Sequence, residues 1–226
     1  MEVGIVAAAG RGKRMGQEIN KQYLNLAGKP LLAHTLSRLF QYPFRELIIV
    51  VAPGEEDYCR EEVLIPYGFM DRARIVSGGK ERQDSVYNAL KILSAETEVV
   101  VVHDGARPLV SREIIANTVN SAYRYGAAIA AVPVKDTIKK VNREGFVVDT
   151  PPRETLWLVQ TPQAFLFPLI LEAYQKAGES GFKGTDDASL LEKEGRPVKI
   201  VKGSYNNIKV TTSDDLCVAE AFLEGE

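Results

Sequence analysis

Residues 3–16 read V-G-I-V-A-A-A-G-R-G-K-R-M-G, an apolar run that passes directly into a glycine-rich, basic loop. A continuous apolar run, in place of strict alternation, predicts a strand buried on both faces of a largely parallel sheet. Similar Val- and Ile-rich runs recur at residues 47–52, 73–77, 99–103, 127–132 and 198–201. The sequence therefore predicts six strands of this kind.

Longer amphipathic stretches with helical spacing separate these runs. They cover residues 30–40, 55–65, 83–93, 112–125 and 213–223. Pro30 suits a first helical position, and Ser111 and Ser213 suit N-caps. Strands that alternate with helices imply right-handed crossover connections. We therefore expect an α/β fold, an open and largely parallel twisted sheet with helices on both faces, as a single domain over residues 1–226.

One segment, residues 136–150, breaks the alternation with the sequence D-T-I-K-K-V-N-R-E-G-F-V-V-D-T. Apolar residues flank the turn signal N-R-E-G at 142–145, which predicts a β-hairpin. An isolated hairpin is marginal in water, so we expect this one to pack on something. Two arrangements stay open: a hairpin that lies on its own domain, or a protruding arm that makes a dimer contact.

The composition of the chain excludes several classes of protein. Its 226 residues carry 28 Lys and Arg against 30 Asp and Glu, a formal net charge of -2. A protein that mainly grips nucleic acid or an acidic membrane would be broadly basic, so an anionic ligand must meet locally placed cations. No apolar stretch approaches the roughly 18 residues of a membrane span, and the first residues lack the basic region of a signal peptide. Cys59 and Cys217 suit free thiols of a reducing compartment, so we expect a cytoplasmic protein.

The loop after the first predicted strand is the strongest local signal for a ligand. Small residues there let backbone N–H groups approach a ligand, and basic residues bring positive charge for phosphates. These residues include Ala8, Ala9, Gly10, Gly12 and Arg14. The spacing is not G-x-x-x-x-G-K-[ST], so this is no Walker loop. It also lacks the third glycine of the dinucleotide fingerprint, which disfavours a nicotinamide-dependent dehydrogenase.

Three further clusters follow along the chain. Lys21, seven residues after Arg14, can reach the same phosphate across the loop or be a solvated lysine. Residues 77–85, S-G-G-K-E-R-Q-D-S, suit an anion or base site at the start of a helix as well as a plain turn and cap. Asp104, within H-D-G-A-R-P, suits a Mg²⁺ or ribose ligand as well as an Asx turn. Because such clusters meet at the carboxyl edge of a parallel sheet, we expect one shared cleft.

Seven stretches of the chain, taken in order, resemble one enzyme family. They are AAAGRGKRMG, KQYLNLAGKPLLAHTL, GGKERQDSV, HDGARP, VPVKDTIK, TPQAF and NIKVTTSDDL. The ordered set is similar to the 2-C-methyl-D-erythritol 4-phosphate cytidylyltransferases of the non-mevalonate isoprenoid pathway. The first stretch alone is shared by many sugar nucleotidyltransferases. The resemblance implies a Rossmann-like nucleotidyltransferase fold in which the hairpin is a dimerisation arm.

The resemblance also implies roles for individual residues. In this family, CTP reacts with methylerythritol 4-phosphate in the presence of Mg²⁺ to give the CDP-alcohol and pyrophosphate. The residues that match the catalytic positions, at the α-phosphate and at the second substrate, are Arg14, Lys21, Arg153 and Lys209. The nucleotide would lie against Ala8, Ala9, Gly10, Gly12, Gly79, Lys80, Ser85, Asp104 and Gly105, with Asp104 also the candidate metal ligand. Contacts to the second substrate would come from Arg107, Thr137, Thr161 and Thr185. The arm would carry Thr137 and Arg153 to the site of the other subunit in a homodimer.

Two alternatives to this activity stay open. One is a cytidylyltransferase for another polyol phosphate, such as ribitol 5-phosphate, and the other is a protein that binds CTP without turnover. Enzymes for ribitol 5-phosphate tend to carry A-G-G where this chain has Ala8-Ala9-Gly10. A phosphate monoester has a second pKa of about 6 and is already largely dianionic at neutral pH. Catalysis then needs positioning and cations and no general base, which suits a chain with two histidines.

Overall fold

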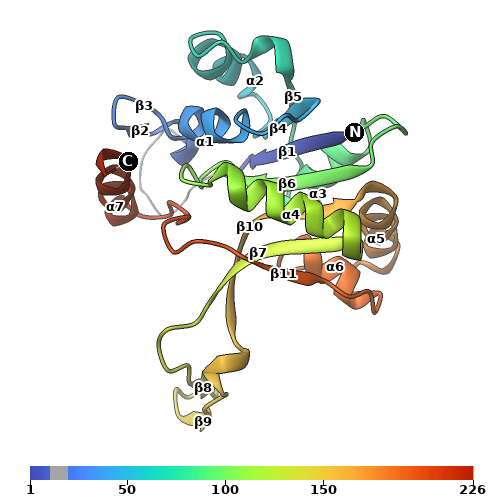
Figure 1. Ribbon diagram of the computed structural model, residues 1–226, viewed down its shortest axis with the longest axis vertical. Helices are drawn as coiled ribbons and strands as arrows, with labels where there is room; N and C mark the ends of the chain where they lie inside the picture. The colour runs from blue at the N-terminus through green and yellow to red at the C-terminus, as the bar shows by residue number, and fades with distance from the viewer. Residues whose placement is uncertain (11–19, 226) are drawn as a thin grey trace.

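The computed structural model describes residues 1–10 and 20–225, and its frame is a seven-stranded sheet (Figure 1). The strand order is β11-β7-β10-β6-β1-β4-β5. These strands are β1 (Glu2–Ala8), β4 (Glu46–Val51), β5 (Ala73–Ser77), β6 (Val99–Asp104), β7 (Ala127–Pro133), β10 (Trp157–Leu166) and β11 (Lys199–Lys202). Within the described part of the chain, β10 runs antiparallel to both neighbours, and the other neighbouring pairs are parallel. The largely parallel α/β sheet predicted from the apolar runs is confirmed.

Helices cover both faces of this sheet, as expected. They are α1 (Leu31–Leu39), α2 (Glu56–Cys59), α3 (Arg82–Leu90), α4 (Arg112–Tyr125), α5 (Phe167–Ser180), α6 (Ala188–Lys193) and α7 (Ser213–Glu224), and a π-helical turn at Arg60–Leu64 continues α2. The side chains of successive strand residues point to opposite faces of the sheet. In β1, Ile5 packs in the core layer under α3, α5 and α6, and Val6 packs in the core layer under α1 and α4. Both side chains are fully buried, and burial of each contributes about 1.5–3 kcal/mol.

The helix starts differ in detail from the sequence predictions. Ser111 caps α4 as predicted, since its hydroxyl accepts a hydrogen bond from a backbone N–H of the first turn at 3.3 Å. The prediction that Ser213 is an N-cap is wrong, because Thr212 holds that position. Thr212 accepts from the Asp215 N–H at 3.3 Å, and the Asp215 carboxylate accepts from the Thr212 N–H at 2.8 Å, so the pair forms a capping box. Pro30 precedes α1 and is not its first residue.

The sequence patterns do not predict β10, α5 or α6. β10 contains Pro162, and a proline inside an apolar run argues against a central strand. The sheet accommodates it with a register shift between Val159 and Gln163 in the pairing with β7, and the pairing with β6 begins at Gln163. Pro162 therefore lies where neither neighbour pairs with it, and its missing N–H costs no ladder hydrogen bond.

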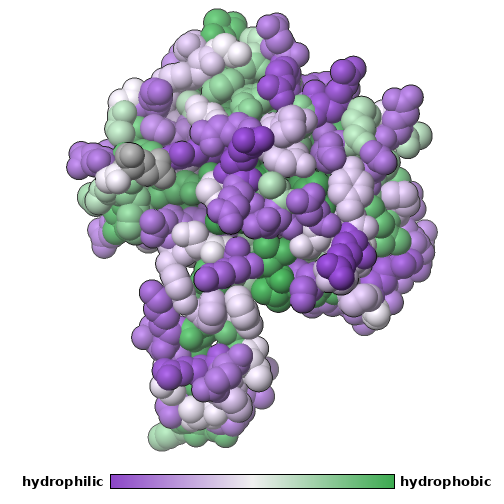
Figure 2. Space-filling model, in the orientation of Figure 1, coloured by the Kyte–Doolittle hydropathy of each residue, from purple (hydrophilic) through white to green (hydrophobic). Residues whose placement is uncertain are grey.

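Residues 136–150 form the predicted hairpin, with β8 (Lys140–Val141) paired to β9 (Val147–Asp149). Asn142 closes the turn, because its Oδ1 accepts from the Phe146 N–H at 2.9 Å. Gly145 has a φ of +88°, which side chains other than glycine rarely adopt. The hairpin projects beyond the edge of the sheet (Figure 1), and Phe146 and Val147 are 69% and 57% exposed. Figure 2 shows this arm as a separate lobe with apolar surface at its far end.

The segment before α7 packs against the loop that follows β6, and this contact determines the position of Lys209. Val210 donates its N–H to the carbonyl of Ala106 at 2.9 Å. Both residues belong to a small buried cluster that α7 covers with Ala219. This anchor places Lys209, the residue before Val210, beside the end of β6.

Candidate active site

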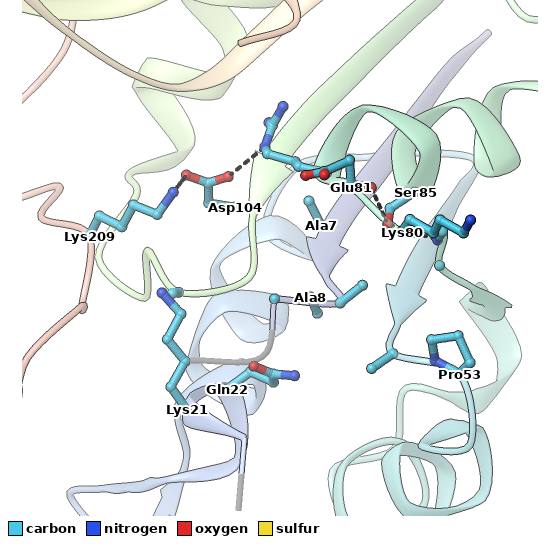
Figure 3. Close-up of a pocket in the computed structure, with 17 residues that line it drawn as sticks. Ala7, Ala8, Lys21, Gln22, Pro53, Lys80, Glu81, Ser85, Asp104 and Lys209 are labelled. Carbon is cyan, nitrogen blue, oxygen red and sulfur yellow. Dashed lines mark hydrogen bonds and ion pairs between the residues drawn. The ribbon is translucent and has the colours of Figure 1, made fainter. Parts of the chain in front are cut away.

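A cavity of about 760 Å³ lies where β1, β4, β5 and β6 end, and it is within the usual size range of small-molecule pockets (Figure 3). Ligands of open parallel sheets bind at this carboxyl edge. The cavity brings together described residues from all four sequence clusters, and the chain before α7 adds Lys209. The predicted site residues that line it are Ala8, Ala9, Gly10, Lys21, Gly79, Lys80, Ser85, Asp104 and Lys209.

The wall beside α3 includes small residues with ordered backbone, in addition to the longer side chains of Lys80, Glu81 and Arg82. A Cβ on Gly78 would stand 2.7 Å from the Ala9 Cβ and 2.9 Å from the Ser85 Oγ, so only glycine fits there. The Gly79 N–H donates to the Ser85 Oγ at 3.0 Å, and the Ser85 hydroxyl donates to the Glu81 carbonyl at 3.0 Å. These bonds fix the turn, and the missing side chains leave room for a flat group to approach the backbone.

Asp104, at the end of β6, is a buried carboxylate surrounded by cations. Lys209 Nζ lies 2.8 Å from its Oδ2, Arg107 Nε lies 3.6 Å from the same oxygen, and Arg82 Nε lies 3.4 Å from Oδ1. Burial by itself raises the pKa of Asp104, but the charges of Arg82, Lys209 and Arg107 outweigh it and hold the pKa well below its usual range. Asp104 is therefore ionised at neutral pH and orients these three cations.

Two lysines from opposite ends of the chain meet at one side of the cavity. Lys21 lies in η1 (Lys21–Tyr23), and its Nζ donates to the carbonyl of Val210 at 3.2 Å. Lys209, the neighbour of Val210 in sequence, extends toward Asp104, and Figure 3 shows both lysines on the same side of the pocket. Lys80 lies on the opposite side, next to Ser85. This arrangement can hold a polyanion between the two sides.

Sequence reasoning did not single out Arg82, which lines the cavity and ties it to a distant part of the chain. Its Nη2 lies 2.7 Å from Oδ2 of Asp187, a carboxylate with no exposed surface, and Tyr174 donates its hydroxyl to the other oxygen of Asp187. Burial lowers the pKa of Arg82, but Asp187 and Asp104 outweigh it and raise the pKa above its usual range. Arg82 stands within the stretch 77–85, which the sequence already marked as a candidate ligand site. The sequence gives no indication that Arg82 pairs with Asp187, which lies 105 residues later.

Thr161 and His103 lie behind Asp104 rather than at the cavity. The Thr161 Oγ1 accepts from the Asp104 N–H at 3.0 Å and donates to His103 Nδ1 at 3.1 Å, while His103 Nε2 donates to the Arg107 carbonyl at 3.1 Å. Burial lowers the pKa of His103 to about 4. The imidazole is therefore neutral at pH 7 and serves to hold the end of β6.

The other predicted site residues lie away from the cavity lining. Gly105 and Arg107 are buried just after β6, and Arg107 donates to the Asn207 carbonyl at 2.7 Å. Thr185 is exposed in the loop before α6. Thr137 is exposed on the arm, and Arg153, 58% exposed in η4 (Arg153–Thr155), lies at its base. Gly12 and Arg14 lie outside the described residues.

A cleft at the carboxyl edge of a parallel sheet, with a small-residue wall and facing lysines, is the arrangement of a nucleotide-binding α/β enzyme. Residues 3–225 match the family model described as 2-C-methyl-D-erythritol 4-phosphate cytidylyltransferase. The chain is therefore a nucleotidyltransferase, and it belongs to the 2-C-methyl-D-erythritol 4-phosphate cytidylyltransferase family.

Individual relatives agree with this assignment. The chain is 52% identical to the 2-C-methyl-D-erythritol 4-phosphate cytidylyltransferase of Desulforamulus reducens, over 98% of this chain and 95% of the relative. It is 55% identical to that of Pelotomaculum thermopropionicum, over 97% and 93% of the two chains. Its fold is similar to the crystal structure of the 4-diphosphocytidyl-2C-methyl-D-erythritol synthase of Anaerococcus prevotii, with a TM-score of 0.87 and 36% identity over 99% and 96% of the two chains. In residues 1–10 and 20–225, no helix has both the length and the apolar character to cross a membrane.

Proposed function

We propose that this enzyme transfers the cytidylyl group of CTP to 2-C-methyl-D-erythritol 4-phosphate, with 4-diphosphocytidyl-2-C-methyl-D-erythritol and pyrophosphate as products. The observation that carries the proposal is the convergence of Lys21 and Lys209 on the side of the cavity that faces the wall of Gly79 and Ser85. The family to which the chain belongs supports the choice of substrates.

The reaction is an in-line exchange at the α-phosphorus of CTP. An oxygen of the methylerythritol phosphate forms a bond to this phosphorus, and the bond to the oxygen that bridges to the β-phosphate breaks, so pyrophosphate leaves with that electron pair. The attacking phosphate needs no general base, because it is largely dianionic at pH 7. Catalysis therefore rests on positioning and on cations aimed at the developing negative charge.

Each side of the cavity has a separate task in this reaction. The cytosine lies against the glycine-rich wall, where the backbone at Gly79 and the Ser85 hydroxyl are fixed. Lys21 lies beside the α-phosphate, with Arg14 assigned to the same group by the family resemblance. Lys209, held by Asp104 before substrate binds, turns toward the incoming phosphate of the second substrate. One ammonium group placed in this way contributes on the order of 10²–10³ in rate.

Mg²⁺ belongs to the same proposal, with Asp104 as its protein ligand. The described residues contain no group of three or more acidic, histidine or cysteine side chains that could form a metal cage by themselves. That composition fits Mg²⁺, which is commonly held by one or two carboxylates together with substrate phosphates and water. When bound, the ion would neutralise phosphate charge; two carboxylates line the cavity, Glu81 and Asp104, and Asp104, the buried one, would hold it.

The assembly that we propose is a homodimer formed through the arm at residues 136–150. The arm leaves apolar side chains in solvent, among them Val141 at 53% and Phe146 at 69% exposed. A two-stranded hairpin is marginal on its own, so a second copy of the chain is the partner that would bury this surface. Thr137 and Arg153 would then reach the cavity of the other subunit. A cytoplasmic location fits the free thiols of Cys59 and Cys217.

The experiment that tests the substrate is a pyrophosphate-release assay with CTP and Mg²⁺. The acceptors are methylerythritol 4-phosphate and ribitol 5-phosphate, each at several concentrations, with a reaction lacking acceptor as the control. We expect the higher kcat/KM with methylerythritol 4-phosphate. A preference for ribitol 5-phosphate would assign the alternative substrate, and CTP binding without release for any acceptor would leave a binding protein.

A further inference from the structure

The turn that carries Lys21 is held in place from outside the cavity. η1 is a single 3-10 turn, and its N-cap residue Asn20 forms no side-chain cap. Such a short turn has little stability of its own. Nevertheless, Gln22 and Tyr23 are only 2% and 9% exposed, so the turn packs firmly against the rest of the chain.

The Glu55 carboxylate accepts hydrogen bonds from three side chains next to Lys21 in the sequence. Glu55 accepts a hydrogen bond from Asn20 Nδ2 on its Oε1. On its Oε2 it accepts from Gln22 Nε2 at 3.3 Å and from the Tyr23 hydroxyl at 3.2 Å. These three donors come from the residue before Lys21 and the two residues after it. Burial, then the neighbouring Cys59 and Glu55, raise the pKa of Tyr23 above its usual range, so its hydroxyl keeps the proton that it donates.

Glu55 is itself fixed to the sheet. Its N–H donates to the Ala52 carbonyl at 3.0 Å, directly after the fully buried end of β4, and its carbonyl accepts from the Cys59 N–H at 2.8 Å. The Tyr23 ring also meets the Tyr58 ring edge-on, with centroids 4.8 Å apart. The loop between β4 and α2 therefore links η1 to β4, whose residues Leu47–Val51 are buried.

We propose that Glu55 is a positioning residue that acts through this contact: its carboxylate fixes residues 20–23 so that the Lys21 ammonium points at the reacting phosphate. The inference rests on the proposed function, because it assumes that Lys21 works at the α-phosphate. An ionised carboxylate suits this task since both its oxygens only accept and its bonds to neutral donors are charge-assisted. Misplacement of a catalytic group by about 1 Å can cost on the order of 10² in rate, so a loosened turn is expected to lower turnover.

The test compares Glu55→Gln with a matched control, Glu61→Gln, which removes the same charge from an exposed position in the turn after α2. In Glu55→Gln one carboxylate oxygen is replaced by an NH₂ group, which is a donor. This NH₂ must face either Asn20 or the pair Gln22 and Tyr23, which are donors too, so the hydrogen bonding on that side is lost. We expect kcat for pyrophosphate release to fall about 10–100-fold, while KM for CTP changes less than about 3-fold. Glu61→Gln should match the wild type.

A second substitution separates positioning from a general loss of stability. Asn20→Asp in the Glu55→Gln background exchanges donor and acceptor, because the amide introduced at position 55 then donates to the new carboxylate at position 20. The oxygen of that amide still accepts from Gln22 and Tyr23. We expect the double variant to recover to within about 5-fold of the wild-type kcat. An unchanged kcat in Glu55→Gln, or a lost kcat that the double variant does not restore, would overturn the inference.

A readout that needs no turnover keeps this inference distinct from the proposed function. The rate at which acetic anhydride labels Lys21, followed by mass spectrometry, reports how firmly the ammonium is held against the Val210 carbonyl. We expect labelling of Lys21 to be severalfold faster in Glu55→Gln and unchanged in Glu61→Gln. Equal labelling in all variants would refute the positioning role whatever the assay shows. A wild type without pyrophosphate release would refute the proposed function.

Discussion

Replacement of Asp104 by asparagine tests the charge arrangement at the end of β6. The substitution keeps the shape and removes the charge that faces Arg82, Arg107 and Lys209 at 3.4, 3.6 and 2.8 Å. Removing one partner of a buried ion pair typically costs about 3–5 kcal/mol. Lys209 is 40% exposed and regains water, and Arg82 keeps Asp187 at 2.7 Å, so we expect the lower end, about 3 kcal/mol. For a chain of this length that corresponds to a Tm roughly 6–12 °C lower.

The assay is urea unfolding at a series of pH values, with Asp71→Asn in the exposed turn η3 (Met70–Arg72) as the control for loss of one charge. The folded-state pKa of Asp104 lies below its unfolded value of about 3.9, so its stabilisation is fully present above about pH 5 and is lost progressively as the pH falls further. The stability difference between wild type and Asp104→Asn should therefore be constant from about pH 5 to 8 and should shrink below about pH 4. Equal stability at pH 7, or a difference that persists unchanged at low pH, would refute this reasoning.

Three further predictions concern separate parts of the molecule. Lys21→Ala should lower kcat on the order of 10²–10³ in the pyrophosphate-release assay and leave the unfolding free energy within about 1 kcal/mol, and near-normal turnover would contradict its assigned role. Tyr174→Phe removes a buried hydroxyl that donates to Asp187 and should cost about 1.5–3 kcal/mol in urea unfolding; an unchanged midpoint would mean that this bond contributes nothing. Light scattering at micromolar concentration should give about twice the 24.9 kDa chain mass for the wild type and a lower average mass for Phe146→Ser, whereas a wild-type monomer would rule out the arm contact.

The central strands could be predicted because their sequence depends only on burial. β1, β4 and β6 lie between two helix layers, so almost every residue is apolar and the run is continuous. β10 has a different task, because it carries Gln160, Thr161 and Gln163 behind the site as well as pairing with two neighbours. Its polar residues and Pro162 hide the strand pattern, and local sequence contains no signal that its irregular centre pairs with neither strand.

The sequence could predict those parts of the candidate site that are formed by consecutive residues, but not the contacts between residues far apart in the chain. The stretches 77–85 and 103–108 each follow a strand, and topology brings such strand ends together. The contacts that hold them in place join residues far apart in sequence, such as Arg82 with Asp187 and Lys209 with Asp104. Glu55 belongs to this second kind, since nothing near it in the sequence indicates that it binds the turn around Lys21.

The electrostatics of the cavity explain how a slightly acidic chain can hold two polyanions. Among the described residues that line it, four are cationic and two are acidic, a formal charge of +2 in a chain whose net charge is -2. The four are Lys21, Lys80, Arg82 and Lys209. Before substrate binds, Asp104 keeps Lys209 and Arg82 together, which would otherwise repel each other. A phosphate that enters the cavity replaces the Asp104 carboxylate as the partner of Lys209, so the Lys209 ammonium is not left buried without a partner. The cations are therefore oriented before substrate binds, and Lys209 can still exchange the carboxylate for the phosphate.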